Sequence, residues 1–99
     1  MIITIIHMKV LPEKRMELSQ AIASLSSSIK MEMGCRRCDL YQSFEDENQL
    51  FLIEEWDIRK NLTAYMESEH FKVLRGAMSL LIEPYDMDIL HRFIPSKDV

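Results

Sequence analysis

The sequence predicts an α+β domain in which strands and helices alternate around one antiparallel sheet. Three observations predict it: strand-like segments at residues 2–10 and 85–93, two helical segments with apolar stripes, and a polar connection between two further strand-like segments in the middle. The chain has 99 residues, which is the length of one small domain. We therefore expect residues 1–99 to form a single domain.

The composition favours a globular protein and restricts the classes of partner that it can bind. Hydrophobic residues make up 47% and charged residues 28%, which is far from the profile of disordered chains. The formal net charge of −4 opposes binding that depends on neutralising phosphates, so nucleic acid is not an expected partner. The apolar opening at residues 2–6 has no basic region before it and is too short for a signal core. We expect a cytoplasmic protein that does not bind membranes.

The first two elements are a strand and a long helix. Residues 2–10 are apolar and β-branched almost throughout, which predicts a central strand buried on both faces. Pro12 can begin a helix that runs over residues 13–33 and stops at Gly34. The apolar stripe of this helix recurs at four-and-three spacing and consists of Leu18, Ile22, Leu25 and Ile29.

The remaining elements follow from turns, caps and alternation. Residues 35–43 and 49–56 read as two strands joined by the polar loop 45–48. Asp57 can cap a helix to Met66, and Ser68 can cap a second helix that ends before Pro84. Its stripe is Phe71, Leu74, Met78 and Leu81. Residues 85–93 alternate with a period of two as a final strand, and the tail 95–99 is expected to be frayed.

The resulting order, β-α-β-β-α-β, is that of ferredoxin-like domains, in which the first and third strands occupy the middle of an antiparallel sheet. The helices predicted here are enough to cover one face of such a sheet. The first strand nevertheless carries aliphatic side chains on both faces, as at Ile5 and Ile6. A second copy of the sheet is the simplest cover for the other face, so we expect a homodimer.

Cys35 and Cys38 form a C-x-x-C pair, for which we expect a structural role. No second cysteine pair or spaced histidine pair completes a zinc site. A redox role would need the first cysteine at a helix N-terminus, whereas residues 34–41 look like a turn that enters a strand. In a regular strand the two thiols would face opposite sides of the sheet. We expect no bound metal.

Three stretches, in this order and spacing, carry a family resemblance: GCRRCDLY at residues 34–41, EEW at 54–56 and AYMESEHF at 64–71. The chain resembles the antibiotic-biosynthesis monooxygenase family from residue 2 to about residue 93. The resemblance implies a dimeric α+β barrel with a pocket between helices and sheet in each subunit. Members include cofactor-independent oxygenases of polycyclic phenols, quinol oxygenases and haem-degrading enzymes, so the family names several chemistries.

The haem-degrading branch is a poor match. That branch uses an Asn on the first strand, a Trp on the helix after the third strand and a haem-ligating His further on. The corresponding positions here are His7, Tyr65 and Arg75. The resemblance therefore implies a member that works without haem.

Candidate catalytic residues are His7, Tyr65 and His70. In the family the position of His7 faces the pocket, and a neutral imidazole there can accept the proton of a phenol or quinol. Tyr65 stands where relatives carry a pocket-facing His or Trp and can hydrogen-bond a substrate oxygen. His70, after the presumed cap Ser68, can lean over the pocket mouth. The alternatives are a strand-end histidine, an amphipathic helix tyrosine and an exposed first-turn histidine.

Candidate substrate-binding residues are Trp56, Met66 and Phe71. For Trp56 we favour a core position near Ile2 or Ile3 over a reacting group, and most of the methionines suit core packing. Glu54 and Glu55 face opposite sides of a central strand, so at least one carboxylate points into a buried layer and needs a partner. Arg92, Arg37 or a residue of a second copy can supply one. We favour this pairing over a general base with a raised pKa.

Two functions remain open from the sequence. The first is a monooxygenase that uses no metal, flavin or haem: a base removes a proton from an electron-rich aromatic, such as a quinol or polycyclic phenol, and the anion passes an electron to dioxygen. The second is a non-catalytic dimeric barrel that binds a small apolar metabolite as a stress or regulatory module. The same pocket serves both.

Overall fold

Four strands form one antiparallel sheet in the computed structural model, which describes residues 1–93 and 95. They are β1 (Ile2–Lys9), β2 (Cys35–Gln42), β3 (Gln49–Trp56) and β4 (Asp86–His91), and they lie in the order β2-β3-β1-β4. The first and third strands are central, as predicted. The ferredoxin-like order is confirmed, while most of the tail expected to fray, residues 96–99, lies outside the described residues.

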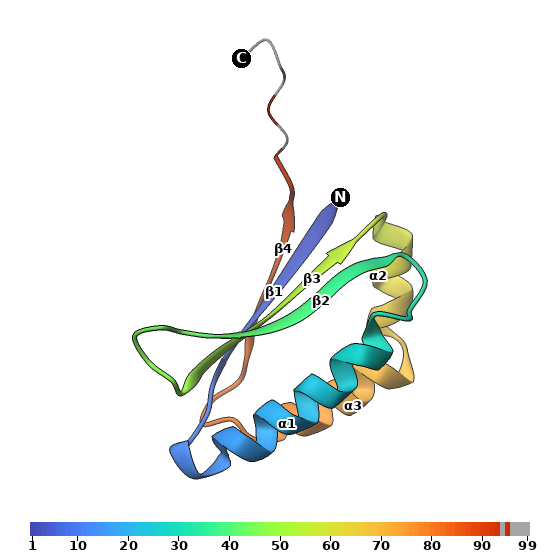
Figure 1. Ribbon diagram of the computed structural model, residues 1–99. Coiled ribbons are helices and arrows are strands. Elements are labelled where there is room, and N and C mark those ends of the chain that lie inside the picture. Colours follow the sequence, from blue (N-terminus) through green and yellow to red (C-terminus); the bar gives the residue numbers. More distant parts are fainter. Residues whose placement is uncertain (94, 96–99) are drawn as a thin grey trace.

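The helices gather on one face of the sheet (Figure 1). They are α1 (Pro12–Ile29), α2 (Arg59–Met66), α3 (Glu69–Ala77) and the short 3₁₀ turn η1 (Met78–Leu80). We call this face the helix side and the other face the open face. Within the described residues, no helix is long and apolar enough to cross a membrane.

Helix α1 begins as predicted and ends earlier than predicted. Pro12 occupies its first turn, where the missing N–H costs nothing. The expected end at Met33 is wrong, because the chain leaves the helix after Ile29 through tight turns that continue to Gly34. Met31 and Met33 are exposed there. Gly34 has a φ of 83°, a conformation that favours glycine, and turns the chain into β2.

The two shorter helices differ in how they are capped. Ser68 caps α3 as predicted, because its hydroxyl accepts a hydrogen bond from the Phe71 N–H at 3.3 Å. The cap of α2 is Ile58, one residue beyond the predicted Asp57. The Asp57 carboxylate instead accepts hydrogen bonds from the Ile58 N–H at 2.6 Å and from Asn61 Nδ2 at 2.9 Å.

The core lies between the helices and the sheet, and β1 shows how the two faces differ. Ile2, Ile6 and Met8 are buried on the helix side, against the stripe of α1. Ile3 and Ile5, on the open face, are only half-buried. In a single chain β1 is therefore fully buried on the helix side alone, so the prediction of burial on both faces is met for one face. An apolar surface remains on the other face.

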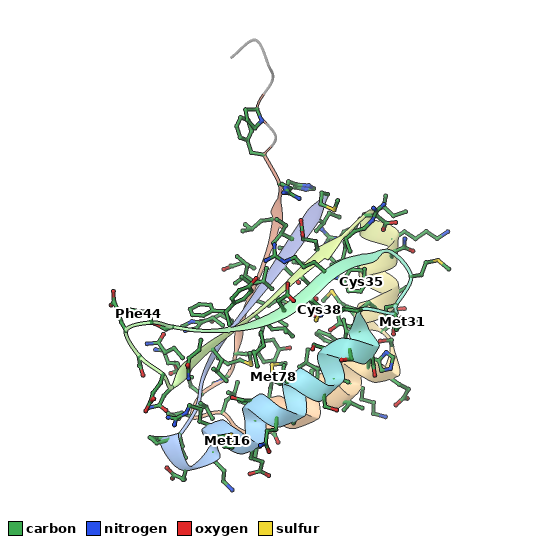
Figure 2. The ribbon with its side chains drawn as sticks, viewed as in Figure 1. Met16, Met31, Cys35, Cys38, Phe44 and Met78 are labelled. Atoms are coloured by element: carbon green, nitrogen blue, oxygen red, sulfur yellow. The ribbon has the colours of Figure 1, made fainter. Side chains whose placement is uncertain are left out.

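A β-bulge changes the predicted position of the cysteines. The pairing of β2 with β3 shifts between Cys35 and Arg37, so that Cys35 lies opposite Trp56 and Cys38 opposite Glu54. Trp56 and Glu54 are two residues apart on one strand and share the helix side. The expectation that the thiols face opposite sides is wrong for this reason. Both point toward the helices (Figure 2), where Cys38 is buried and Cys35 half-buried.

Candidate functional site

The most unusual group on the helix side is the carboxylate of Glu54, which is fully buried in the middle of β3. Three side chains from three elements donate hydrogen bonds to it. Thr4 on β1 donates to Oε1 at 2.8 Å, and Trp56 donates to the same oxygen at 3.2 Å. Tyr65 on α2 donates to Oε2 at 2.8 Å. The carboxylate is thus held in a fixed orientation, with one oxygen directed at a phenol.

Tyr65 is one of the candidates that the sequence predicts, whereas its partner Glu54 was expected to be a structural acid. Tyr65 is buried, and its ring stacks on Trp56 with 4.6 Å between the ring centroids. Phe71 of α3 contacts the same ring edge-on at 5.3 Å. Glu54, Trp56, Tyr65 and Phe71 therefore form one cluster, which we call the tyrosine cluster: an acid–phenol pair inside an aromatic shell.

The titration of this cluster is set mainly by burial. Burial raises the pKa of Glu54, and the hydrogen bonds from Tyr65, Thr4 and Trp56 oppose that rise. Burial and the neighbouring Glu54 raise the pKa of Tyr65. Burial also raises the pKa of Cys35 to about 11 and that of Cys38 further. At neutral pH the phenol and both thiols are therefore neutral, and Glu54 is the group of this cluster that can exchange a proton.

His7 lies on the open face, away from the tyrosine cluster. It pairs across β1 and β3 with Phe51, and the two rings stack at 4.6 Å between centroids. Its Nε2 donates to Gln49 Oε1 at 2.8 Å, and its Nδ1 lies 4.0 Å from the Asp86 carboxylate. The expectation that His7 faces the layer between helices and sheet is wrong, because β1 alternates and Ile6 and Met8 take that side.

The other predicted residues lie at the helices. Trp56 is fully buried opposite Ile2, so the core position near Ile2 is confirmed. Met66 is partly buried and packs against the core. His70 begins α3 and donates from Nδ1 to Glu32 Oε1 at 2.8 Å, in the turn region after α1. This hydrogen bond ties the start of α3 to that turn.

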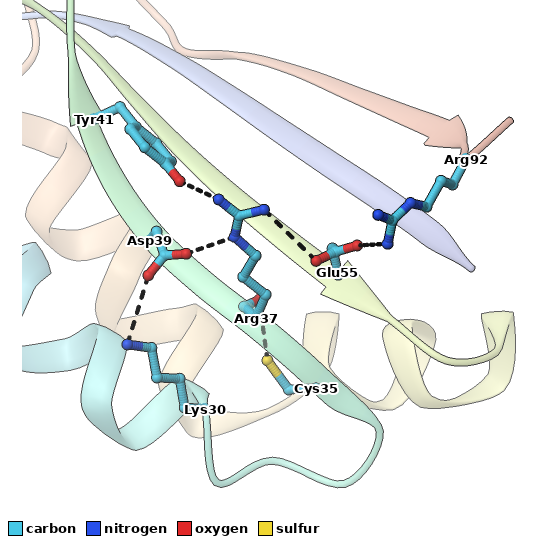
Figure 3. Close-up of polar contacts among 7 residues, drawn as sticks. All are labelled: Lys30, Cys35, Arg37, Asp39, Tyr41, Glu55 and Arg92. Atoms are coloured by element: carbon cyan, nitrogen blue, oxygen red, sulfur yellow. Dashed lines mark hydrogen bonds and ion pairs between the residues drawn. The ribbon is translucent and has the colours of Figure 1, made fainter. Parts of the chain in front are cut away.

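Glu55 has the partner that the sequence called for. Its carboxylate lies on the open face and contacts Arg92 at 2.8 Å and Arg37 at 3.8 Å (Figure 3). Arg37 in turn bonds Asp39 at 2.7 Å and the Tyr41 hydroxyl. The two adjacent glutamates thus have different partners: Glu55 contacts positively charged side chains, while the described side chains that bond Glu54 are all neutral donors.

The site is closed in this structure. Among the described residues no cavity opens between helices and sheet, because aromatic and aliphatic side chains fill that layer. Over the same residues, no group of three or more His, Cys, Asp or Glu side chains is arranged to hold a metal ion. The tyrosine cluster can move a proton, and a ligand that reaches it has to displace part of its cover.

A Glu54→Gln variant is expected to become more stable relative to the parent as the pH rises. Because the folded pKa of Glu54 is above its ordinary value, its contribution is fully present at acid pH and is lost as the pH rises through the folded pKa. Glutamine keeps the shape and does not ionise. Melting temperatures of both proteins from pH 4 to 9 check this, and a constant difference across that range would contradict it.

Two comparisons with known proteins agree on the class. The family model described as "Antibiotic biosynthesis monooxygenase" matches residues 1–77, and the chain belongs to this family. The Bacillus subtilis (strain 168) protein named "Putative monooxygenase YcnE" is 32% identical over 89 residues, which cover 88% of this chain and 93% of that protein.

Solved structures agree with the fold. A structure named "Putative antibiotic biosynthesis monooxygenase from Nitrosomonas europaea" has a TM-score of 0.88 at 25% identity and covers 95% of this chain and 100% of that one. A conserved protein from Methanosarcina mazei Go1 has a TM-score of 0.87 at 28% identity and covers 93% of this chain and 92% of that one. The predicted family and fold are both confirmed.

Proposed function

We propose that this protein is a cofactor-independent monooxygenase that acts on an electron-rich aromatic bearing a hydroxyl group, such as a quinol or polycyclic phenol. The family membership and the name of the Bacillus subtilis relative support a monooxygenase role. In such a reaction the protein removes a proton, and the substrate anion itself supplies the electron to dioxygen. The protein has to provide a dry aromatic site and a group that handles the proton.

The observation that carries the proposal is the tyrosine cluster. Tyr65 combines an aromatic ring, stacked on Trp56 and contacted edge-on by Phe71, with a hydroxyl held at 2.8 Å from a buried carboxylate. These are the two features that recognition of an aromatic alcohol needs. We assign Trp56, Met66 and Phe71 to substrate contact and Tyr65 to the reacting hydroxyl, with His70 at the start of α3 as a candidate at the edge of the site.

Substrate entry has to move the cover of Tyr65. That cover comes from α2 and α3, which are eight and nine residues long and join at Glu67 and Ser68. Met66 and Phe71 flank this junction. Because Phe71 of α3 contacts the Tyr65 ring, we expect a ligand to reach that ring by displacing side chains at this junction.

We also propose a homodimer formed by the open faces of two sheets. Ile3, Ile5, Phe51 and Ile53 are half-buried there, and the pair of Glu55 with Arg92 lies at one end of this surface. A second copy covers the apolar centre and desolvates His7, whose ring stacks on Phe51. This assigns different tasks to the two faces: association to one and chemistry to the other.

Oxygen uptake is the test of the proposed reaction. The purified protein is expected to consume oxygen in the presence of anthrones or naphthoquinols with no cofactor added. Tyr65→Phe is expected to lower this rate, because it removes the hydroxyl while leaving the ring stacked on Trp56. An oxygen electrode, with the spontaneous oxidation of each compound subtracted, gives the rates.

His7→Ala decides between the two faces. If the reaction occurred on the open face with His7 as its base, this variant would lose about 10² to 10⁴ in rate, as the loss of a general base typically costs. A loss confined to Tyr65→Phe supports the helix side. If aromatic compounds raise the melting temperature of the protein and none is oxidised, the non-catalytic ligand-binding barrel replaces this proposal.

A further inference from the structure

We propose that Glu54 is the final proton acceptor of this site and that Tyr65 relays the proton to it from the hydroxyl of an aromatic substrate. This inference rests on the proposed function and deepens it. The hydroxyl of Tyr65 donates to Glu54 Oε2 at 2.8 Å. A tyrosine hydroxyl that already donates keeps its oxygen lone pairs, so toward any ligand it acts as an acceptor. The ligand that suits it carries a hydroxyl donor on an aromatic ring.

The orientation of the carboxylate supports a relay. Thr4 and Trp56 both donate to Oε1, at 2.8 and 3.2 Å, which leaves Oε2 to Tyr65. The indole N–H of Trp56 can only donate, so Oε1 stays an acceptor in either protonation state of Glu54. A proton that arrives from Tyr65 therefore binds Oε2, the oxygen that faces it.

The proton transfer balances within these three groups. The O–H bond of the substrate breaks, and its proton binds the Tyr65 oxygen. The original Tyr65 proton leaves for Glu54 Oε2, so the tyrosine is neutral before and after. Glu54 becomes a neutral acid and the substrate becomes the anion. The buried layer holds one negative charge throughout, and in a medium of low dielectric constant moving a charge costs less than creating a new pair.

Among the residues that the structure describes, no other group facing Glu54 competes with it as a proton acceptor. The titratable side chains that face Glu54 are Tyr65 from α2 and Cys35 and Cys38 from β2, and burial keeps all three protonated at neutral pH. The buried residues that α1 and α3 direct toward this layer are not titratable; they are Leu18, Ile22, Ser26, Ile29, Phe71 and Leu74. Burial also raises the pKa of Glu54, which makes its carboxylate a stronger base than an exposed one.

The experiment uses the full-length protein and 1,4-dihydroxynaphthalene, whose acidic protons are on hydroxyl groups of the aromatic ring and whose anion absorbs at longer wavelengths than the neutral molecule. Under nitrogen, mixing with the parent protein is expected to produce the bound anion. Glu54→Gln and Tyr65→Phe are each expected to slow its formation by about 10² or more, the typical effect of a lost base. Glu45→Gln, which removes an exposed carboxylate in the loop between β2 and β3, is the matched control and is expected to behave as the parent.

The pH profile separates proton transfer from a structural role. The parent rate is expected to fall at acid pH as Glu54 becomes protonated, and Glu54→Gln is expected to lose this dependence. If Glu54→Gln does not fold, Glu54→Asp replaces it with a different expected result. This variant keeps a carboxylate but withdraws it from Tyr65 by one methylene, so anion formation is expected to slow while the fall at acid pH remains, and an unchanged rate overturns the relay.

The outcomes separate the relay from the oxygenase. Oxygen consumption that is unchanged in Glu54→Gln overturns the relay and leaves the proposed function standing. An anion that forms under nitrogen in the parent and not in Glu54→Gln supports the relay, even if air brings no oxygen uptake, in which case the oxygenase proposal fails alone. No anion and no uptake with the parent overturns both.

Discussion

The Ile6→Asp variant is expected not to fold, whereas Ile5→Asp is expected to fold as a monomer. Ile6 is fully buried on the helix side, beside Leu52 and Met87. An unpaired carboxylate there costs several kcal/mol, a large part of the roughly 5 to 15 kcal/mol that stabilises a domain. Ile5 is half-buried in the middle of the open face, so a charge there reaches water in one chain and is trapped only in a dimer.

Circular dichroism and sedimentation together check this pair. Ile6→Asp is expected to lack cooperative unfolding, and Ile5→Asp to keep the parent spectrum at half the parent mass. Ile5→Val, which preserves an apolar side chain at the same place, is the control and is expected to remain dimeric. A folded Ile5→Asp dimer would show that the open face is not the interface between copies.

Gly34→Ala is expected to destabilise the domain by about 2 to 5 kcal/mol, from the strain of a left-handed residue plus a steric clash. Gly34 has a φ of 83°, and a Cβ added there would lie 2.3 Å from Asp57 Oδ1 and 2.5 Å from Asn61 Nδ2. Both side chains would have to move, which breaks the hydrogen bonds that Asp57 makes at the start of α2. The start of β2 and the start of α2, which Gly34 brings close together, would then move apart.

Thermal unfolding measures this loss, and the chain contains a matched control. Gly76 lies in α3 with a negative φ, and a Cβ added there meets nothing within 4 Å. Gly76→Ala is therefore expected to stabilise the protein by up to about 1 kcal/mol, because alanine favours the helix. Equal effects at the two glycines would contradict this account of Gly34.

The fold follows from local patterns wherever the chain keeps one period. The four-and-three stripe at Leu18, Ile22, Leu25 and Ile29 predicts the buried face of α1. Three of these residues are buried, and Leu25 is partly buried against the core. The alternation in residues 85–93 predicts β4. The end of α1 was missed because Met31 and Met33 look like a continuing helix. The end of α1 is determined by the hydrogen bonds of the turn and by the conformation of Gly34. The spacing of the apolar residues carries no information about either.

The site is less predictable because it depends on tertiary contacts and on strand parity. Tyr65 and Glu54 are eleven residues apart on different elements, so no local spacing predicts their hydrogen bond. The sequence also leaves the face of His7 undetermined. Alternation puts it on the same face as Ile3 and Ile5, but both faces of β1 are aliphatic, so the pattern does not say which face meets the helices, and the family resemblance suggested the wrong one. The prediction that the two thiols of the C-x-x-C pair face opposite sides of the sheet was wrong, because an inserted residue reverses the alternation between Cys35 and Cys38.

The bulge in β2 also bears on how the sheet avoids unwanted polymerisation. β2 is one of the two outermost strands, and the outer backbone groups of such a strand are a template for another chain. The bulge interrupts the regular spacing of those groups next to Arg36 and Arg37, both exposed and both charged. A strand of another chain that approached this end of β2 would meet an interrupted row of backbone hydrogen-bonding groups and two positive charges. The same inserted residue that directs both thiols inward is thus expected to make this end of β2 a poor template for edge-to-edge pairing.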